Sequence, residues 1–110
     1  MPRGWAGPNL LAMILFEKYG HGRRHFFELA DPALRKKKLH SSIALQAVQR
    51  IDVLFAIERE INGQPHEVRR AVRQQRSVPL MAELEIWMKS ERARVSRHTD
   101  VAKAFDYMLT

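Results

Sequence analysis

The stretch from Ile43 to Asn62 constrains the fold most, because its apolar residues recur at intervals of three or four positions. That spacing places them on one face of an α-helix. The stripe consists of Ala44, Ala47, Val48, Ile51, Leu54 and Phe55. Ser41 or Ser42 suits the N-cap, and Gly63 suits the position after the last turn. The pattern therefore predicts a long amphipathic helix whose apolar face other helices must cover.

Further segments show helical patterns separated by residues that break helices. Pro8 suits a first turn and Gly20 a helix end, Asp31-Pro32 stops the second segment, and Pro79 restarts the chain after a polar stretch. Thr99 suits the N-cap of the last segment. The predicted helices cover residues 9–19, 21–30, 43–62, 66–76, 79–95 and 99–110. No run alternates with a period of two, as a half-buried strand would. We therefore predict an all-α protein of about six helices in a small irregular bundle, without a sheet.

The first predicted helix, residues 9–19, is apolar on more than one face. Its apolar run Leu10–Phe16 is too short to span a bilayer, so the sequence predicts no membrane partner. A monomer of 110 residues can hardly cover such a helix on all sides. We expect this helix to meet a partner or to derive from a larger protein.

Positive charge is concentrated in two parts of the chain, whose formal net charge is +7. Residues 1–40 contain 8 Lys and Arg against 3 acids, and residues 63–76 contain 4 against 1. Part of this charge forms a predicted basic helical stripe that could contact successive phosphates non-specifically, although an ordinary solvated helix face is the alternative. The candidate DNA-phosphate residues are Arg23, Arg24, Arg69, Arg70, Arg73 and Arg76, and the basic loop Arg35–Lys38 adds to them. No helix shows the pattern of a base-reading recognition helix.

His21 and His25 are the best candidates for a metal-binding pair, because a spacing of four places both on one helical face. A metal site needs at least one more ligand, and no histidine or acid stands at a suitable spacing from them. Histidines that face solvent or accept hydrogen bonds are the preferred interpretation, and we predict no metal site.

Catalytic chemistry has no clear location in the sequence. The chain lacks cysteine and any glycine-rich phosphate loop. Its acids often stand three or four residues from basic ones, which predicts surface ion pairs such as Glu67–Arg70, Glu85–Lys89 and Glu91–Arg94. We therefore predict no catalytic residue, no cofactor and no small-molecule substrate, and a cytoplasmic location.

The sequence from His21 to Thr110 resembles the central part of the insertion sequence 66 family of bacterial transposases. The segments that carry this resemblance are RRHFFELAD, IDVLFAIEREING, VRQQRSVPL and AFDYMLT. Separately, PRGWAGPNLLAMILFEKYG, residues 2–20, is similar to a family segment that precedes the catalytic core. The resemblance divides the chain into a detached upstream helical segment, residues 1–20, and a partial helical central region, residues 21–110.

The resemblance implies an Asp-Asp-Glu transposase that uses divalent metal ions, but no residue here matches a member of that triad. In the family, two aspartates lie between the two segments, and a glutamate follows the counterpart of Thr110. We therefore expect a truncated, internally deleted transposase remnant without catalytic activity and with at most weak, non-specific DNA binding. The alternative is a small helical interaction module that associates with itself or with full-length transposase through residues 9–19.

Overall fold

The chain forms four continuous helices in a computed structural model that describes residues 8–31 and 42–110. The first consists of α1 (Pro8–Met13), the π-helical segment η1 (Ile14–Tyr19) and α2 (Gly20–Ala30). The others are α4 (Ser42–Ile61), then α5 (His66–Val72) with η2 (Arg73–Ser77) and α6 (Val78–Arg94), and last α7 (Asp100–Leu109). The described part contains no strand, so the all-α prediction is confirmed, whereas the prediction of about six helices is wrong. Within it, no helix has the length and apolarity that a bilayer span requires.

Gly20 does not end the first helix, contrary to the prediction. Its backbone angles, φ −64° and ψ −49°, are those of a right-handed helix. Glycine costs about 1 kcal/mol relative to alanine inside a helix, which is too little to break one that packs on both sides. Tyr19, just before Gly20, and Gly22, just after it, are both buried. The first helix therefore continues through residue 20.

Pro79 does not restart the chain either, because η2 ends two residues before it and the helix continues through it. Proline lacks an N–H group, and its ring clashes with the carbonyl four residues earlier in a regular α-helix. In η2 the N–H of Val78 donates to the carbonyl oxygen of Arg73, five residues earlier. This wider turn lets the helix pass through Pro79 without ending. The predicted polar helix and the predicted amphipathic helix are thus one rod.

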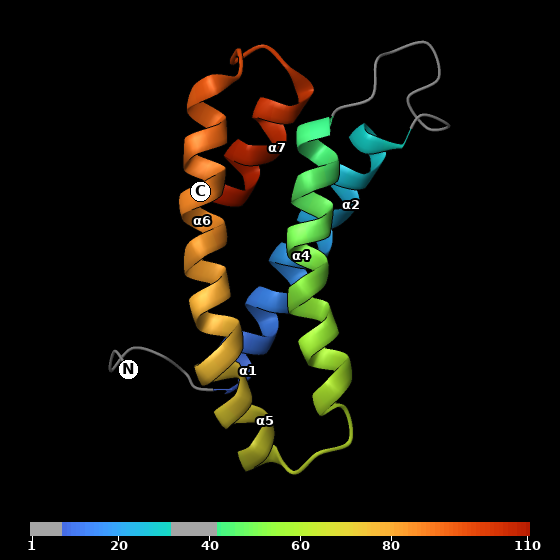
Figure 1. Cartoon of the computed structure of the whole chain (residues 1–110), viewed down its shortest axis with the longest axis vertical. Coiled ribbons are helices and arrows are strands. Elements are labelled where there is room, and N and C mark those ends of the chain that lie inside the picture. The colour runs from blue at the N-terminus through green and yellow to red at the C-terminus, as the bar shows by residue number, and fades with distance from the viewer. Residues whose placement is uncertain (1–7, 32–41) are drawn as a thin grey trace.

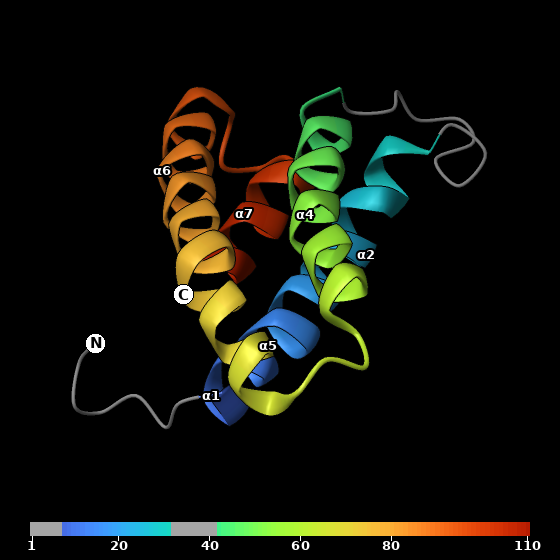
Figure 2. The same cartoon turned by 60° about the horizontal axis from the view of Figure 1, so that its bottom comes forward.

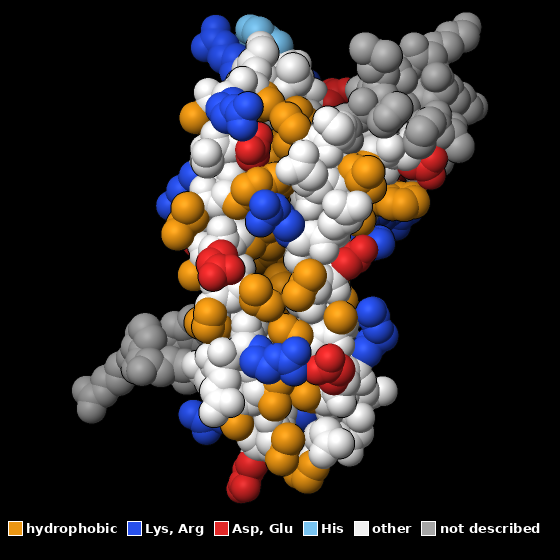
Figure 3. All heavy atoms as spheres, in the orientation of Figure 1, with side chains coloured by type: hydrophobic (Ala, Val, Ile, Leu, Met, Phe, Trp, Pro, Cys, Tyr) orange, Lys and Arg blue, Asp and Glu red, His pale blue; other side chains and the backbone are white. Residues whose placement is uncertain are grey.

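The helices form two layers, as Figures 1 and 2 show from two directions. In front, α4 and α6 run side by side, and behind them lie the first helix and α7. The largest fully buried apolar side chains come from all four helices: Leu11, Leu15, Phe26, Ile51, Leu54, Ile57, Met88 and Phe105. The predicted stripe of α4 is confirmed as part of this core, with Phe55 only partly buried. Figure 3 shows apolar side chains along the seam between α4 and α6, with basic and acidic side chains scattered beside it.

The connections between helices use the turn residues expected from the sequence. Gly63 has φ +84°, a left-handed conformation that favours glycine after a helix. The Thr99 hydroxyl accepts a hydrogen bond of 3.2 Å from the N–H of Ala102, so Thr99 is the predicted N-cap of α7. The basic loop Arg35–Lys38 and Ser41 lie outside the described residues.

Tyr19 makes the stability of the folded state depend on pH in the alkaline range. Burial, reinforced by the negative charge of Glu85 on α6, raises the pKa of Tyr19 to about 12. In the unfolded chain a tyrosine ionises near pH 10. The folded state thus holds the phenol proton more tightly, a stabilisation that is complete below about pH 10 and is lost as the pH rises through about 12.

We expect the free energy of unfolding to fall more steeply over this range in the parent protein than in Tyr19→Phe. Urea titrations at pH values from about 9 to about 12 measure the difference. Comparison of the two proteins near neutral pH controls for lost packing. Parallel pH profiles would contradict the assignment.

Candidate nucleic-acid interface

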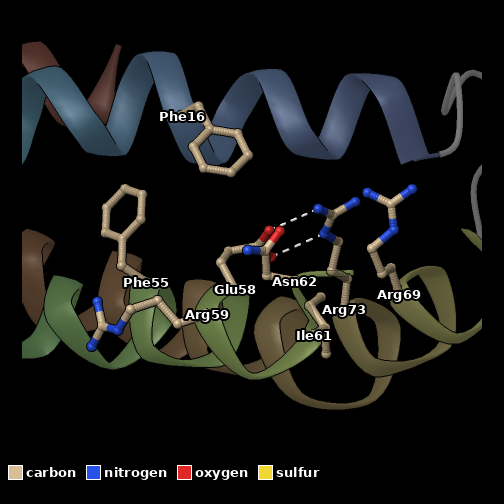
Figure 4. A pocket seen from close by; sticks show the side chains of 8 residues that line it. All are labelled: Phe16, Phe55, Glu58, Arg59, Ile61, Asn62, Arg69 and Arg73. Atoms are coloured by element: carbon tan, nitrogen blue, oxygen red, sulfur yellow. Dashed lines mark hydrogen bonds and ion pairs between the residues drawn. The ribbon is translucent and has the colours of Figure 1, made fainter. Parts of the chain in front are cut away.

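A groove lies between η1 on one side and the corner formed by α4, α5 and η2 on the other (Figure 4). Its volume is about 330 Å³. Phe16 and Phe55 lie at one end of it, and Arg69 and Arg73 lie at the other. The groove brings together residues that are far apart in the sequence, from three of the four helices.

A buried ion pair, Glu58–Arg73, lies in the lining of this groove. The Nε of Arg73 donates to Glu58 Oε2 at 2.9 Å, and its Nη2 donates to Glu58 Oε1 at 2.7 Å. Each side chain is only 8% exposed. The hydrogen bond to Glu58 raises the pKa of Arg73 above its usual value and outweighs the opposing effect of burial. The pair joins α4 to η2 in a fixed, two-bonded geometry.

Sequence reasoning missed that Arg73 faces inward, although a signal for it exists. Arg73 and Ser77 extend the spacing of Leu80 and Leu84 backwards by steps of four and three, so they share the buried face of a continuous helix. We predicted a break before Pro79, which hid this continuity. Arg73 is therefore not part of an exposed basic stripe with Arg69 and Arg76.

The other predicted phosphate contacts differ in how free their guanidinium groups are. Arg23 is paired with Asp52 of α4, and Arg76 is 2.6 Å from Glu60. The Arg24 side chain is 83% exposed, with Glu28 at 3.6 Å. Arg70 is exposed, and the predicted Glu67–Arg70 pair is absent among the described contacts, whereas Glu85–Lys89 and Glu91–Arg94 form at 3.2 and 3.3 Å.

Two further arginines, Arg69 and Arg59, line the groove. The Nε of Arg69 is buried and has no hydrogen-bond partner. Arg59, in the last turn of α4, is exposed and also lines the groove. We did not single out Arg59 from the sequence, although a basic residue in the last turn of the best-defined helix was a usable signal. The groove thus has three arginines beside one acid.

The predicted histidine pair lies on the surface. His21 and His25 are both exposed, and the His25 ring lies 6.2 Å from that of Tyr107. Across residues 8–31 and 42–110, no three histidines or acids gather where they could hold a metal ion.

The apolar helix at 9–19 is covered on one side only. Leu11, Leu15 and Tyr19 are buried, whereas Met13 and Phe16 are 54% and 52% exposed. Association with a partner through this helix stays a prediction, and Met13 and Phe16 are the side chains that such a partner would meet.

Comparison with known proteins gives two kinds of match. Residues 19–110 match the protein family described as "Transposase IS66 family". The chain is 48% identical over 97 residues to "Uncharacterized protein y4hP" of Sinorhizobium fredii (strain NBRC 101917 / NGR234), which covers 83% of this chain. It is 35% identical over 104 residues to "Uncharacterized protein y4jD" of the same organism, which covers 94% of this chain. The chain spans 18% of the length of each relative. No solved structure matches.

Proposed function

Because this chain belongs to the IS66 family of transposases, we propose that it acts as a helical DNA-contacting region and performs no strand transfer by itself. The contact is with the phosphate backbone and is independent of base sequence. The single observation that supports this most is the presence of exposed arginines without strong partners, Arg24 and Arg70, in a chain of net charge +7. When such arginines bind phosphates, they displace the counterions condensed on the DNA, which favours binding.

The pairing of the acids supports the proposal that the chain performs no strand transfer by itself. A transposase centre needs carboxylates that are free to bind divalent metal ions. Here Asp52, Glu58 and Glu60 each lie against an arginine from another helix, and Asp106 lies 2.7 Å from Arg92. These acids pair with arginines across helices, so we propose that the 110 residues carry no metal cofactor of their own.

Arg70→Ala and Arg24→Ala test the DNA contact. The logarithm of the binding constant for a short duplex falls with the logarithm of the salt concentration. Each variant should make this slope less steep by about one, because one phosphate contact is lost. Fluorescence anisotropy with a labelled duplex at several salt concentrations measures this slope. The loss should be the same for duplexes of unrelated sequence.

Arg97→Ala is the matched control, because Arg97 is also exposed but lies in the turn before α7 and outside the candidate set. It removes the same charge from the chain. If Arg97→Ala lowered the slope as much as Arg70→Ala, the effect would come from net charge alone, and the assigned contact would be wrong. A parent protein that binds no duplex at low salt would refute the proposed function.

A further inference from the structure

We propose that the groove in Figure 4 binds one nucleotide of single-stranded DNA, with its base against Phe16 and Phe55 and its phosphate at Arg69. This inference rests on the proposed function, because it takes DNA as the partner. It goes further by naming the form of DNA and the residues that would hold it.

The arginine end of the groove carries more positive charge than the described acids balance. Glu58 is the acid that lines it, and Arg73 already occupies both of its oxygens. Figure 4 shows the guanidinium group of Arg69 beside that of Arg73, and the Nε of Arg69 is buried without a partner. Buried donors of this kind are rare in folded proteins. A phosphate at the arginine end of the groove would offset the excess positive charge of Arg69 and Arg73.

The aromatic end of the groove suits a nucleobase. The ring centroids of Phe16 and Phe55 are 6.1 Å apart, with planes inclined at 47°. Phe16 is 52% exposed although it is a large apolar side chain beside the core. Proteins that bind single strands combine a positively charged groove with aromatic side chains on which bases stack, because every base offers a flat face. The groove places the two groups in the order in which a nucleotide presents its base and phosphate.

The size and the walls of the groove favour an unpaired strand over a duplex. Its volume of about 330 Å³ lies at the small end of ligand pockets, so it can hold one flat group. In a duplex the base faces are stacked on each other and cannot reach Phe16. Both walls also contain a π-helical segment, η1 through Phe16 and η2 through Arg73. Such segments are frequent at functional sites.

The test uses the full chain and two labelled probes, a short oligothymidine strand and a duplex of the same length, in anisotropy titrations. Phe16→Ala should weaken single-strand binding roughly 5- to 150-fold, the range for loss of one base–aromatic stack, and leave duplex binding unchanged. Arg69→Gln should also weaken single-strand binding and lower its salt slope by about 0.7. Phe27→Ala is the matched control, since Phe27 lies on the same continuous helix, is 41% exposed and does not line the groove.

Phe16→Leu keeps the apolar packing and removes the ring, so it separates stacking from folding. It should lose single-strand affinity like Phe16→Ala while circular dichroism stays at the parent value. Unchanged single-strand affinity in both Phe16 variants would overturn the inference, even with duplex binding intact. If the parent protein bound no duplex but still bound the single strand, and the Phe16 variants still weakened single-strand binding, the proposed function would be overturned and the groove assignment would not.

Two other occupants are outcomes of the same experiment. Equal affinity for single-stranded RNA of the same length would overturn the choice of DNA. A parent dimer that Phe16→Ala converts to a monomer in light scattering, without any change in single-strand affinity, would assign the groove to a second copy and overturn the inference.

Discussion

Glu58→Gln should lower the free energy of unfolding by about 3 to 5 kcal/mol, because it leaves the charge of Arg73 buried without a counter-charge. The effect is large because Arg73 is 8% exposed and has both hydrogen bonds with this one carboxylate. A typical domain is stable by only about 5 to 15 kcal/mol, so the variant should unfold at much lower urea concentration. Urea titration followed by circular dichroism measures the change.

Glu60→Gln is the control, since Glu60 lies on the same helix and pairs with Arg76 at 2.6 Å, but both side chains are more than half exposed. An exposed pair contributes about 0 to 1 kcal/mol. The double variant Glu58→Leu with Arg73→Met should recover most of the lost stability, because apolar residues of similar volume often replace a buried ion pair without loss. Equal, small effects of Glu58→Gln and Glu60→Gln would show that water reaches the Glu58–Arg73 pair.

The Glu58–Arg73 ion pair is an example of a contact that the sequence did not predict. The stripe of α4, the left-handed Gly63 and the Thr99 N-cap follow from spacing and residue type within a few positions, and the structure confirms all three. Local signals suffice there because each depends on neighbours along one helix. Partners such as Glu58 and Arg73 stand on different helices, so no local spacing predicts them.

The two missed helix joins have a shared cause. Gly20 and Pro79 are ordinary helix-breaking signals, and each follows a π-helical segment directly or by one residue. The altered register carries the helix through, at a local cost that burial of the surrounding apolar residues outweighs. At both places tertiary packing therefore outweighed the low helix propensity of the residue. The sequence did not predict the groove for the same reason, because two of the three helices that line it are these continuous helices.

Phe105→Ala should lower the free energy of unfolding by about 3 to 5 kcal/mol, because it removes a fully buried ring and leaves a cavity between three helices. The Phe105 ring lies 5.1 Å from that of Phe26 on α2 and 5.9 Å from that of Trp87 on α6. A helix as short as α7, with 10 residues, is marginal in water without such packing. We expect urea titration to show the loss and hydrogen exchange to show faster opening of α7 than of α4.

Tyr107→Ala provides the comparison, since Tyr107 is an aromatic residue on the same helix that is 43% exposed. Its removal deletes a similar ring with little burial, so it should cost far less than Phe105→Ala. Phe105→Leu should fall between them, because leucine refills part of the space. If Phe105→Ala and Tyr107→Ala were equally mild and α7 amides kept their protection, α7 would be docked by contacts other than this ring. The ring of Phe105 would then not be what holds the two layers together at this end of the molecule.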